Sequence, residues 1–190
     1  MLLLVGLGNP GSNYTNTRHN IGFKIIDAIN AHFKLSKQKP KFKGLLTTGN
    51  IDEKKIYAIK PLTFMNNSGT AIKELIDYFK IDAKDVFVFH DDLDIDFGKI
   101  KAKFGGSSAG HNGIESIDKF IGKDYSRVRI GIGHPKTKKK VNNHVLEDFK
   151  EDEEEKINDI TINIVKQLPT LIEKKIDLFS SKVNQDLNGI

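Results

Sequence analysis

The sequence predicts an α/β fold: one domain spanning residues 1–190, with a mixed, mostly parallel central sheet flanked by helices. Short segments that are apolar at every position, such as residues 2–5 and 86–89, are typical of strands buried inside a parallel sheet. Between them lie segments such as residues 21–33, whose apolar side chains recur at helical spacing. Strands that alternate with helices favour this fold class, and 190 residues suffice for one domain with a full core.

The predicted elements follow one another in a regular order. Strands are expected at residues 2–5, 45–51, 55–59, 86–89, 99–104 and 128–132. Helices are expected from about Asn20, from a cap at Ser68, after the glycine-rich residues 105–113, and twice in the tail from Glu151, on either side of Pro169. Residues 34–43, which contain five lysines and one proline, are expected to form an exposed loop.

Composition narrows the class of protein. The net charge is +9 over residues 1–150 and −4 over residues 151–190, which together give the chain's +5. A positive body favours a polyanionic partner such as nucleic acid, although a lysine-rich surface can also be plain compositional bias. The absence of cysteine excludes disulfides, zinc–thiolate sites and a cysteine nucleophile. With no apolar run long enough for a membrane helix and no signal-peptide pattern, we expect a cytoplasmic protein without a membrane segment.

A glycine-rich turn follows the first strand. Gly6-Leu-Gly8-Asn-Pro-Gly11 fits the G-x-G-x-x-G pattern of dinucleotide-binding folds. Such a site needs a helix that begins inside the loop, so that backbone amides meet the pyrophosphate, whereas residues 12–20 are polar with no apolar face. The segment is therefore interpreted as a tight turn, either purely structural or one that fixes the Asn9 side chain at the carboxyl end of the strand.

Other polar segments precede predicted helices. His19 lies at a loop–helix junction, where the helix dipole favours the neutral imidazole that can act as a base. Asn66 and Asn67 precede the second helix, so one of their amides is free to donate to a carbonyl oxygen. The loop at residues 105–113, which includes Asn112, is suited to bind an anion or oxyanion but lacks the Gly-Lys-Ser/Thr of a P-loop. Each of these residues could equally be an ordinary cap or turn former.

Four titratable residues, His90, Asp91, Asp92 and Asp94, follow the strand at 86–89, where functional groups of open α/β sheets usually lie. They could form a metal site, although magnesium is usually held by one or two carboxylates plus phosphates. A single aspartate that accepts a hydrogen bond from an imidazole is an equally good use of the segment, and solvated loop acids are a third.

Basic residues lie on two of the predicted strands. Alternation puts Lys101 with Lys103 on one face of their strand, and Arg127 with Arg129 on one face of theirs. These four are candidates for phosphate contacts, with ordinary charged strand faces as the alternative.

Taken together, the motifs resemble those of the bacterial-type peptidyl-tRNA hydrolase family. They occur in the family's order and spacing over about the first three-quarters of the chain: Val5-Gly-Leu-Gly-Asn-Pro-Gly11, Tyr14, Thr17-Arg-His-Asn-Ile-Gly-Phe23, Lys60-Pro-Leu-Thr-Phe-Met-Asn-Asn-Ser-Gly69, His90-Asp-Asp-Leu-Asp94, Gly105-Gly-Ser-Ser-Ala-Gly-His-Asn-Gly113 and Arg129-Ile-Gly-Ile-Gly-His-Pro135. The resemblance implies a monomeric α/β hydrolase that cleaves the ester between a peptide and the 3′ ribose of tRNA. It implies no metal and no organic cofactor.

The resemblance also implies roles for individual residues. His19 is expected to be the general base and Asp92 its orienting partner, with Asp91 left out. The amides that hold the substrate and its developing oxyanion are expected to be Asn9, Asn66 and Asn112. The groove for the 3′ end and the peptide is expected to include Tyr14 and Met65. The pair that grips the tRNA 5′-phosphate is expected to be Lys103 and Arg129.

Three other functions remain as alternatives. A metal-dependent phosphoesterase would use the residues from His90 to Asp94, and a chelator would abolish its activity. A non-catalytic tRNA-binding module would bind tRNA without releasing peptide. A dinucleotide-dependent oxidoreductase is the weakest alternative, because the loop after Gly11 does not begin a helix.

Overall fold

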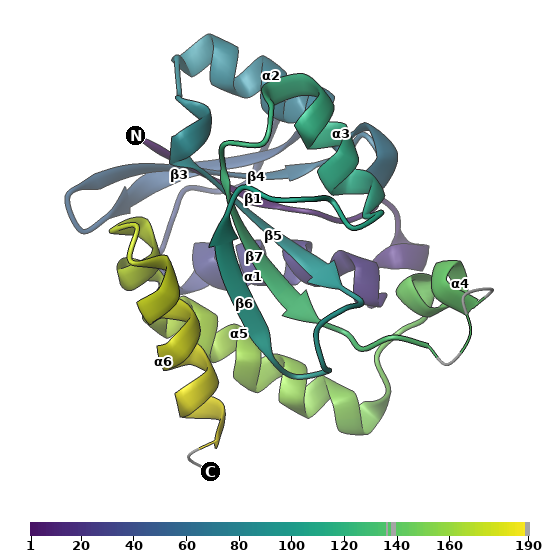
Figure 1. The fold of residues 1–190 in the computed structure, drawn as a ribbon. Helices are drawn as coiled ribbons and strands as arrows, with labels where there is room; N and C mark the ends of the chain where they lie inside the picture. The colour runs from purple at the N-terminus through teal and green to yellow at the C-terminus, as the bar shows by residue number, and fades with distance from the viewer. Residues whose placement is uncertain (136, 138–139, 189–190) are drawn as a thin grey trace.

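Seven strands form one sheet in the computed structural model, which describes residues 1–135, 137 and 140–188. The order across the sheet is β2-β3-β4-β1-β5-β7-β6 (Figure 1). The strands are β1 Leu2–Gly6, β2 Lys39–Lys41, β3 Gly44–Ile51, β4 Lys54–Pro61, β5 Val86–Asp92, β6 Ile100–Phe104 and β7 Ser126–Gly131. The expected α/β class with a mixed sheet is confirmed.

Parallel pairing is confined to the four central strands. β1 pairs in parallel with β4 and with β5, and β5 pairs in parallel with β7. β2, β3 and β6 join by antiparallel pairing at the two edges. Because the carboxyl ends of β1, β5 and β7 meet at one edge of the sheet, polar residues that follow these strands are brought together there.

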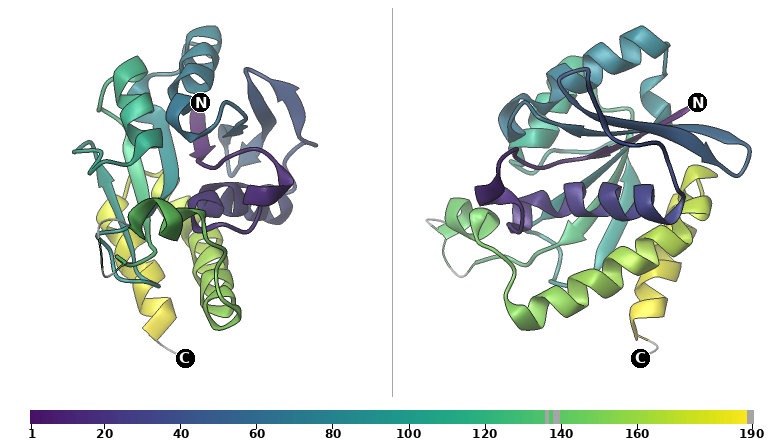
Figure 2. Two further views of the ribbon diagram at one scale, coloured as in Figure 1. Left: turned by 90° about the vertical axis from the view of Figure 1, so that its right-hand side faces the viewer. Right: turned by 180° about the vertical axis from the view of Figure 1, so that it is seen from behind.

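Helices cover both faces of the sheet. They are α1 Ile21–His32, α2 Ser68–Phe79, α3 Asn112–Ile121, α4 Val141–Leu146, α5 Glu151–Ile172 and α6 Ile176–Asn188. One core cluster joins Phe87 and Phe89 to α1, α5 and α6, and the other joins Val86 and Val88 to α2 and α3. Figure 2 shows α1 and α5 lying across the sheet when it is seen from behind. The alternation of side chains along β5 therefore separates the two cores.

Three expectations about local structure are wrong in detail. Ser68 is the first residue of α2 rather than its cap, and its hydroxyl donates to the carbonyl of Met65 at 2.9 Å. Pro169 does not separate two helices: α5 runs through it to Ile172, because its last turns bury apolar side chains against the sheet. The lysine-rich segment at residues 34–43 contains the short edge strand β2.

The helix after the glycine-rich turn begins late. Two short 3-10 helices, Ser12–Tyr14 and Arg18–Asn20, precede α1, which starts at Ile21. The geometry of a dinucleotide site is therefore missing from this loop. Among the described residues, no helix combines the length and the apolar character needed to cross a membrane.

Candidate active site

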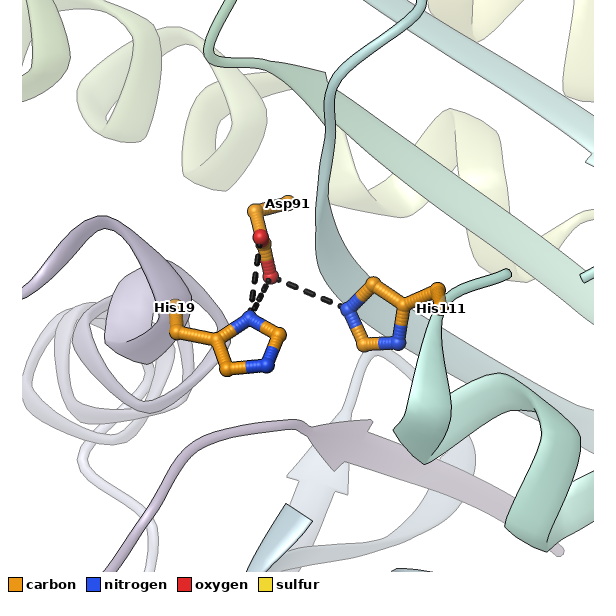
Figure 3. A group of neighbouring side chains, drawn as sticks. All are labelled: His19, Asp91 and His111. Carbon is orange, nitrogen blue, oxygen red and sulfur yellow. Dashed lines mark hydrogen bonds and ion pairs between the residues drawn. The ribbon is translucent and has the colours of Figure 1, made fainter. Parts of the chain in front are cut away.

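A histidine–aspartate–histidine chain lies at the carboxyl edge of the sheet (Figure 3). His19 comes from the 3-10 helix before α1, Asp91 from β5, and His111 from the residue before α3. The Nδ1 atom of His19 lies 2.8 Å from Oδ1 and 2.9 Å from Oδ2 of Asp91. The Nε2 atom of His111 lies 3.0 Å from Asp91 Oδ1. One carboxylate thus holds two imidazoles.

The hydrogen bonds fix which ring nitrogens carry protons. His111 caps α3, and its Nδ1 accepts from the amides of Gly113 and Ile114 at 3.1 and 3.3 Å. An accepting Nδ1 has no proton, so in the neutral ring the proton is on Nε2, which donates to Asp91. His19 likewise donates from Nδ1 to the carboxylate, and this leaves Nε2 of neutral His19 with a free lone pair. His19 is therefore held in the form that can accept a proton.

Electrostatics supports the same assignment. Burial alone lowers the pKa of His19, but the charge of Asp91 and the hydrogen bond to it outweigh burial and raise the pKa above the ordinary 6.5. Burial raises the pKa of Asp91, yet His19 and His111 together hold it far below its usual range. Asp91 is thus a permanent anion, only 1% exposed, that favours a positive charge on His19.

The expected contact between His19 and Asp92 is wrong: the partner of His19 is Asp91. β5 does not end at Phe89 but continues through Asp92, so neighbouring side chains still alternate between the faces of the sheet. Asp91 follows Phe89 on the side of α1, where His19 lies. Asp92 points to the opposite side, where its Oδ2 accepts from Nε of Arg129 at 2.7 Å.

The segment from His90 to Asp94 does not form the metal site considered from the sequence. Nδ1 of His90 donates to the backbone oxygen of Asp91 at 2.7 Å, and the Asp92 carboxylate faces Arg129. Within the described part of the chain, the group able to hold a cation is instead His19, Asp91 and His111, whose ligating atoms lie within 4.8 Å of one another. Those atoms are already joined by hydrogen bonds.

The turn that carries His19 is anchored by its neighbour Arg18. The Arg18 guanidinium is buried and donates to the backbone oxygen of Asp148 at 2.8 Å and to Glu153 Oε2 at 2.6 Å. It also lies over the ring of Phe149, 5.4 Å from the centroid. These contacts with Asp148, Phe149 and Glu153 therefore fix the backbone of the turn that carries His19.

Asn9 is held in the turn by a reciprocal pair of hydrogen bonds. Its backbone N–H donates to Oδ1 of Asn20 at 2.8 Å, and Nδ2 of Asn20 donates back to the Asn9 oxygen at 2.9 Å. The side-chain Oδ1 of Asn9 accepts from the amide of Met65 at 2.8 Å. Since the oxygen is occupied, the Asn9 side chain presents its NH₂ group as a donor.

Two cavities meet at His19. The first, of about 360 Å³, runs along His111, the 108–110 loop and α4. The second, of about 450 Å³, is lined by Asn9, Phe64, Met65 and Asn66. The residues that line both are His19, Asn112, Asn142 and Val145. His19 therefore faces both spaces.

The expected site residues fall into four groups, the first of which is Asp92 alone, a residue that lines the first cavity. The structure brings His19, Asn9, Met65, Asn66 and Asn112 to the second cavity. Tyr14 lines neither cavity, and its ring packs edge-on against Phe64 at 6.5 Å between centroids. Lys103 and Arg129 lie on β6 and β7, outside both linings.

The two arginines of β7 have different environments. Arg127 is 1% exposed and donates to the Ser107 oxygen at 2.8 Å and to Asp118 at 2.7 Å, so it is a structural residue. Arg129 is partly exposed. Partial burial and the nearby charges of Arg129 and Arg127 lower the pKa of Lys103, so both guanidinium groups lie close enough to act on its ammonium group.

Sequence reasoning missed Asp91, His111, Phe64 and Asn142. Asp91 could have been found by extending the alternation of β5 two residues further. His111 lies in the glycine-rich loop already selected, but its hydrogen bond to β5 depends on the fold. Phe64 is 53% exposed and adopts a positive φ of 58°, an unusual conformation for a bulky residue and one that no sequence pattern indicates.

Comparisons with known proteins agree with this architecture. A family model described as peptidyl-tRNA hydrolase matches residues 3–189. A peptidyl-tRNA hydrolase of Pelagibacter ubique is 73% identical over 184 residues, which cover 97% of this chain and 99% of the relative. One from Ehrlichia ruminantium is 46% identical over 181 residues, covering 95% and 93%. The crystal structure of the peptidyl-tRNA hydrolase from Acinetobacter baumannii matches with a TM-score of 0.91 at 34% identity, covering 97% of this chain and 94% of that one. This chain belongs to the peptidyl-tRNA hydrolase family.

Proposed function

We propose that this chain hydrolyses the ester bond between the peptide and the 3′ ribose of peptidyl-tRNA, with His19 as general base and Asp91 as its orienting partner. The observation that carries the proposal is the hydrogen bond from His19 Nδ1 to a buried carboxylate at 2.8 Å, beside a cavity lined by four asparagines. Family membership supports the same reaction.

The reaction needs one proton acceptor at the start. A water molecule beside His19 attacks the ester carbonyl while Nε2 takes its proton, and Asp91 stabilises the imidazolium that forms. The tetrahedral intermediate then collapses, and the ribose 3′ oxygen leaves with the proton that His19 returns. A histidine suits both steps because its pKa lies near the working pH.

The carboxamides supply the second requirement, which is stabilisation of the negative charge on the carbonyl oxygen. Asn9 presents its NH₂ group because Met65 occupies its oxygen, and Asn66 and Asn112 line the same cavity. Amide groups do not titrate, so they can donate to the oxyanion throughout the pH range of the enzyme. A preorganised donor of this kind is worth about 3–4 kcal/mol in the transition state.

Recognition of tRNA is assigned to Lys103 and Arg129. Both lie on the sheet face of α2 and α3: Arg129 is on β7, the neighbour of the strand that carries Asp91, and Lys103 is on β6, one strand further out. A pair of cations that contacts an end phosphate reads no sequence, and this suits an enzyme that accepts many tRNAs. Tyr14 and Met65 are assigned to the groove for the 3′ end and the peptide, Tyr14 acting through its contact with Phe64.

The proposal extends to the state of the protein in the cell. The chain is proposed to act as one domain and as a monomer in the cytoplasm, with peptidyl-tRNA as its partner. The observation in favour is that one chain suffices to line the cavity with His19, Asn9, Asn66 and Asn112. Light scattering across a tenfold range of concentration should give the mass of one chain, 21.3 kDa. A constant mass of two chains would contradict the monomer.

The direct test is a hydrolysis assay with purified peptidyl-tRNA, using the wild type and His19→Ala. The wild type should release peptide, whereas His19→Ala should still bind the substrate but release almost none. The same assay on a minimal nucleotide ester, with and without a chelator, addresses the metal-dependent alternative. Ester cleavage that the chelator abolishes would contradict the proposed mechanism, and wild-type binding without peptide release would favour a non-catalytic tRNA-binding module.

A further inference from the structure

Asp92 lines the first cavity together with His19 and Asp91, but its carboxylate is bound by other residues. Its carboxylate is buried, and two hydrogen bonds account for both oxygens. Oδ1 accepts from the backbone amide of Asp94 at 2.9 Å, which fixes the side chain against its own turn. Oδ2 accepts from Nε of Arg129 at 2.7 Å. A carboxylate held at one oxygen by the backbone can act as a rigid support for whatever binds the other.

The register of the sheet explains why these two side chains meet. Asp92 lies opposite Gly131 on β7, and Arg129 lies opposite His90. Asp92 and Arg129 therefore share one face of the sheet, because Asp92 is two positions along β5 from His90, the residue that pairs with Arg129.

Asp92 binds Nε of Arg129 rather than a terminal nitrogen, and this choice leaves the terminal nitrogens for a ligand. A bond to Nε fixes the plane of the Arg129 guanidinium while leaving its two terminal nitrogens, the pair that binds a phosphate in bidentate fashion. Among the described residues, those terminal nitrogens have no recorded partner, and the side chain is 16% exposed. Arg127 is the contrast on the same strand: both of its terminal nitrogens are occupied by Ser107 and Asp118.

The charges around Lys103 supply the second argument. Partial burial, Arg129 and Arg127 lower the pKa of the Lys103 ammonium group, while Asp92 is the nearby anion that raises it. Cations so placed repel one another until an anion binds between them. Asp92 offsets this repulsion and prevents Arg129 from turning away from Lys103.

We propose that Asp92 is a positioning residue: it aims the terminal nitrogens of Arg129, beside Lys103, at the 5′-phosphate of the tRNA. The inference rests on the proposed phosphate contact of Lys103 and Arg129. It gives the acidic cluster two separate tasks, with Asp91 serving the base and Asp92 serving substrate recognition.

A binding experiment tests this independently of hydrolysis. Deacylated tRNA is prepared with a 5′-phosphate or a 5′-hydroxyl, and the Kd for each is measured at fixed low salt. The wild type should prefer the phosphorylated tRNA. Asp92→Ala should lose about tenfold of that preference, the effect of one well-placed hydrogen bond. Asp92→Asn keeps an oxygen that can accept from Arg129 Nε and should retain most of it.

Two controls separate positioning from simpler effects. Asp96→Asn removes an exposed charge from the same loop and should leave the preference unchanged. In the Arg129→Ala background, Asp92→Ala should cause no further loss, because Asp92 acts through Arg129. A melting curve for each variant reports whether the Asp92 turn is also needed for folding.

The outcomes distinguish this inference from the proposed function. If Arg129→Ala loses the preference and a folded Asp92→Ala keeps it, the positioning role is wrong while the phosphate contact stands. If Asp92→Ala and Asp92→Asn both bind phosphorylated tRNA more tightly, Asp92 is only a repelling charge and the inference is again overturned. If the wild type shows no preference, both the phosphate contact and this role are wrong, whereas hydrolysis by His19 is unaffected.

Discussion

Asp91 and Asp92 are neighbours in the chain and yet serve different partners. Asp91 is buried between two imidazoles, at 2.8 Å from His19 and 3.0 Å from His111. Asp92 binds the guanidinium of Arg129 at 2.7 Å. The difference arises because β5 continues through both residues, so one side chain points to each face. Two neighbouring aspartates at a strand end thus bind different partners, although both line the first cavity.

The largest expected loss of activity comes from the catalytic pair of Asp91 and His19. His19→Ala should lower kcat by about 10²- to 10⁴-fold, the usual contribution of general acid–base catalysis, on both peptidyl-tRNA and a minimal ester. The Kd for tRNA should stay within about twofold, because the imidazole does not contact the phosphate. Single-turnover kinetics and filter binding measure the two quantities. Near-normal turnover by this variant would remove His19 from the mechanism.

The next largest effect concerns the oxyanion. Asn112→Ala should lower kcat by about 10²-fold, since it removes one donor from the site where negative charge develops. Asn67→Ala is a matched control, because Asn67 is exposed and lines neither cavity. Steady-state kinetics on a minimal ester gives the comparison. Equal losses in the two variants would show that Asn112 acts through the fold rather than through the carbonyl oxygen.

A smaller effect is expected on the side of Asp92. Arg129→Ala and Lys103→Ala should each raise KM for whole peptidyl-tRNA by about tenfold, the order of one charge-assisted contact, and barely change KM for a minimal ester. Arg127→Ala should instead lower the melting temperature, because it leaves the buried Asp118 carboxylate without its ion pair. If the Lys103 and Arg129 variants lose equally on both substrates, the phosphate role is refuted.

The smallest expected effect is a displacement in the pH profile. His19 accepts a proton only when neutral, so activity should fall as pH drops through its pKa, which Asp91 raises above 6.5. Asp91→Asn removes the charge that favours the imidazolium and so lowers the pKa of His19. In the pH profile of the activity that this variant retains, the acid limb of kcat/KM should therefore move to lower pH. Asp92→Asn should leave the limb in place. A limb that moves only in Asp92→Asn would reverse the assignment.

The parts predictable from sequence are those governed by local patterns. Apolar segments located β1 and β5, and the polar stretch before Ile21 located the start of α1. The pattern failed where tertiary contacts decide. α5 continues through Pro169 because Leu168 and Leu171 are buried. β5 continues into charged residues because it stays paired with β7 through Asp92, and because Asp91 and Asp92 bind His19 and Arg129.

The site shows the same division. Asn9, His19, Asn66 and Asn112 could be selected because each stands beside a turn or a helix start. The choice between Asp91 and Asp92 could not be made from residue type, since both are aspartates at one strand end. It depended on where the strand stops, and a strand end is set by pairing with β7 rather than by its own composition.

The most direct measurement is kcat on a minimal nucleotide ester for Asp91→Asn and Asp92→Asn side by side. Asp91→Asn should lose about 10³- to 10⁴-fold, because an amide at Nδ1 favours the wrong tautomer of His19. Asp92→Asn should stay within about twofold, because a substrate without the tRNA body makes no use of Arg129. A large loss in Asp92→Asn together with a near-normal Asp91→Asn would contradict the division of the two carboxylates.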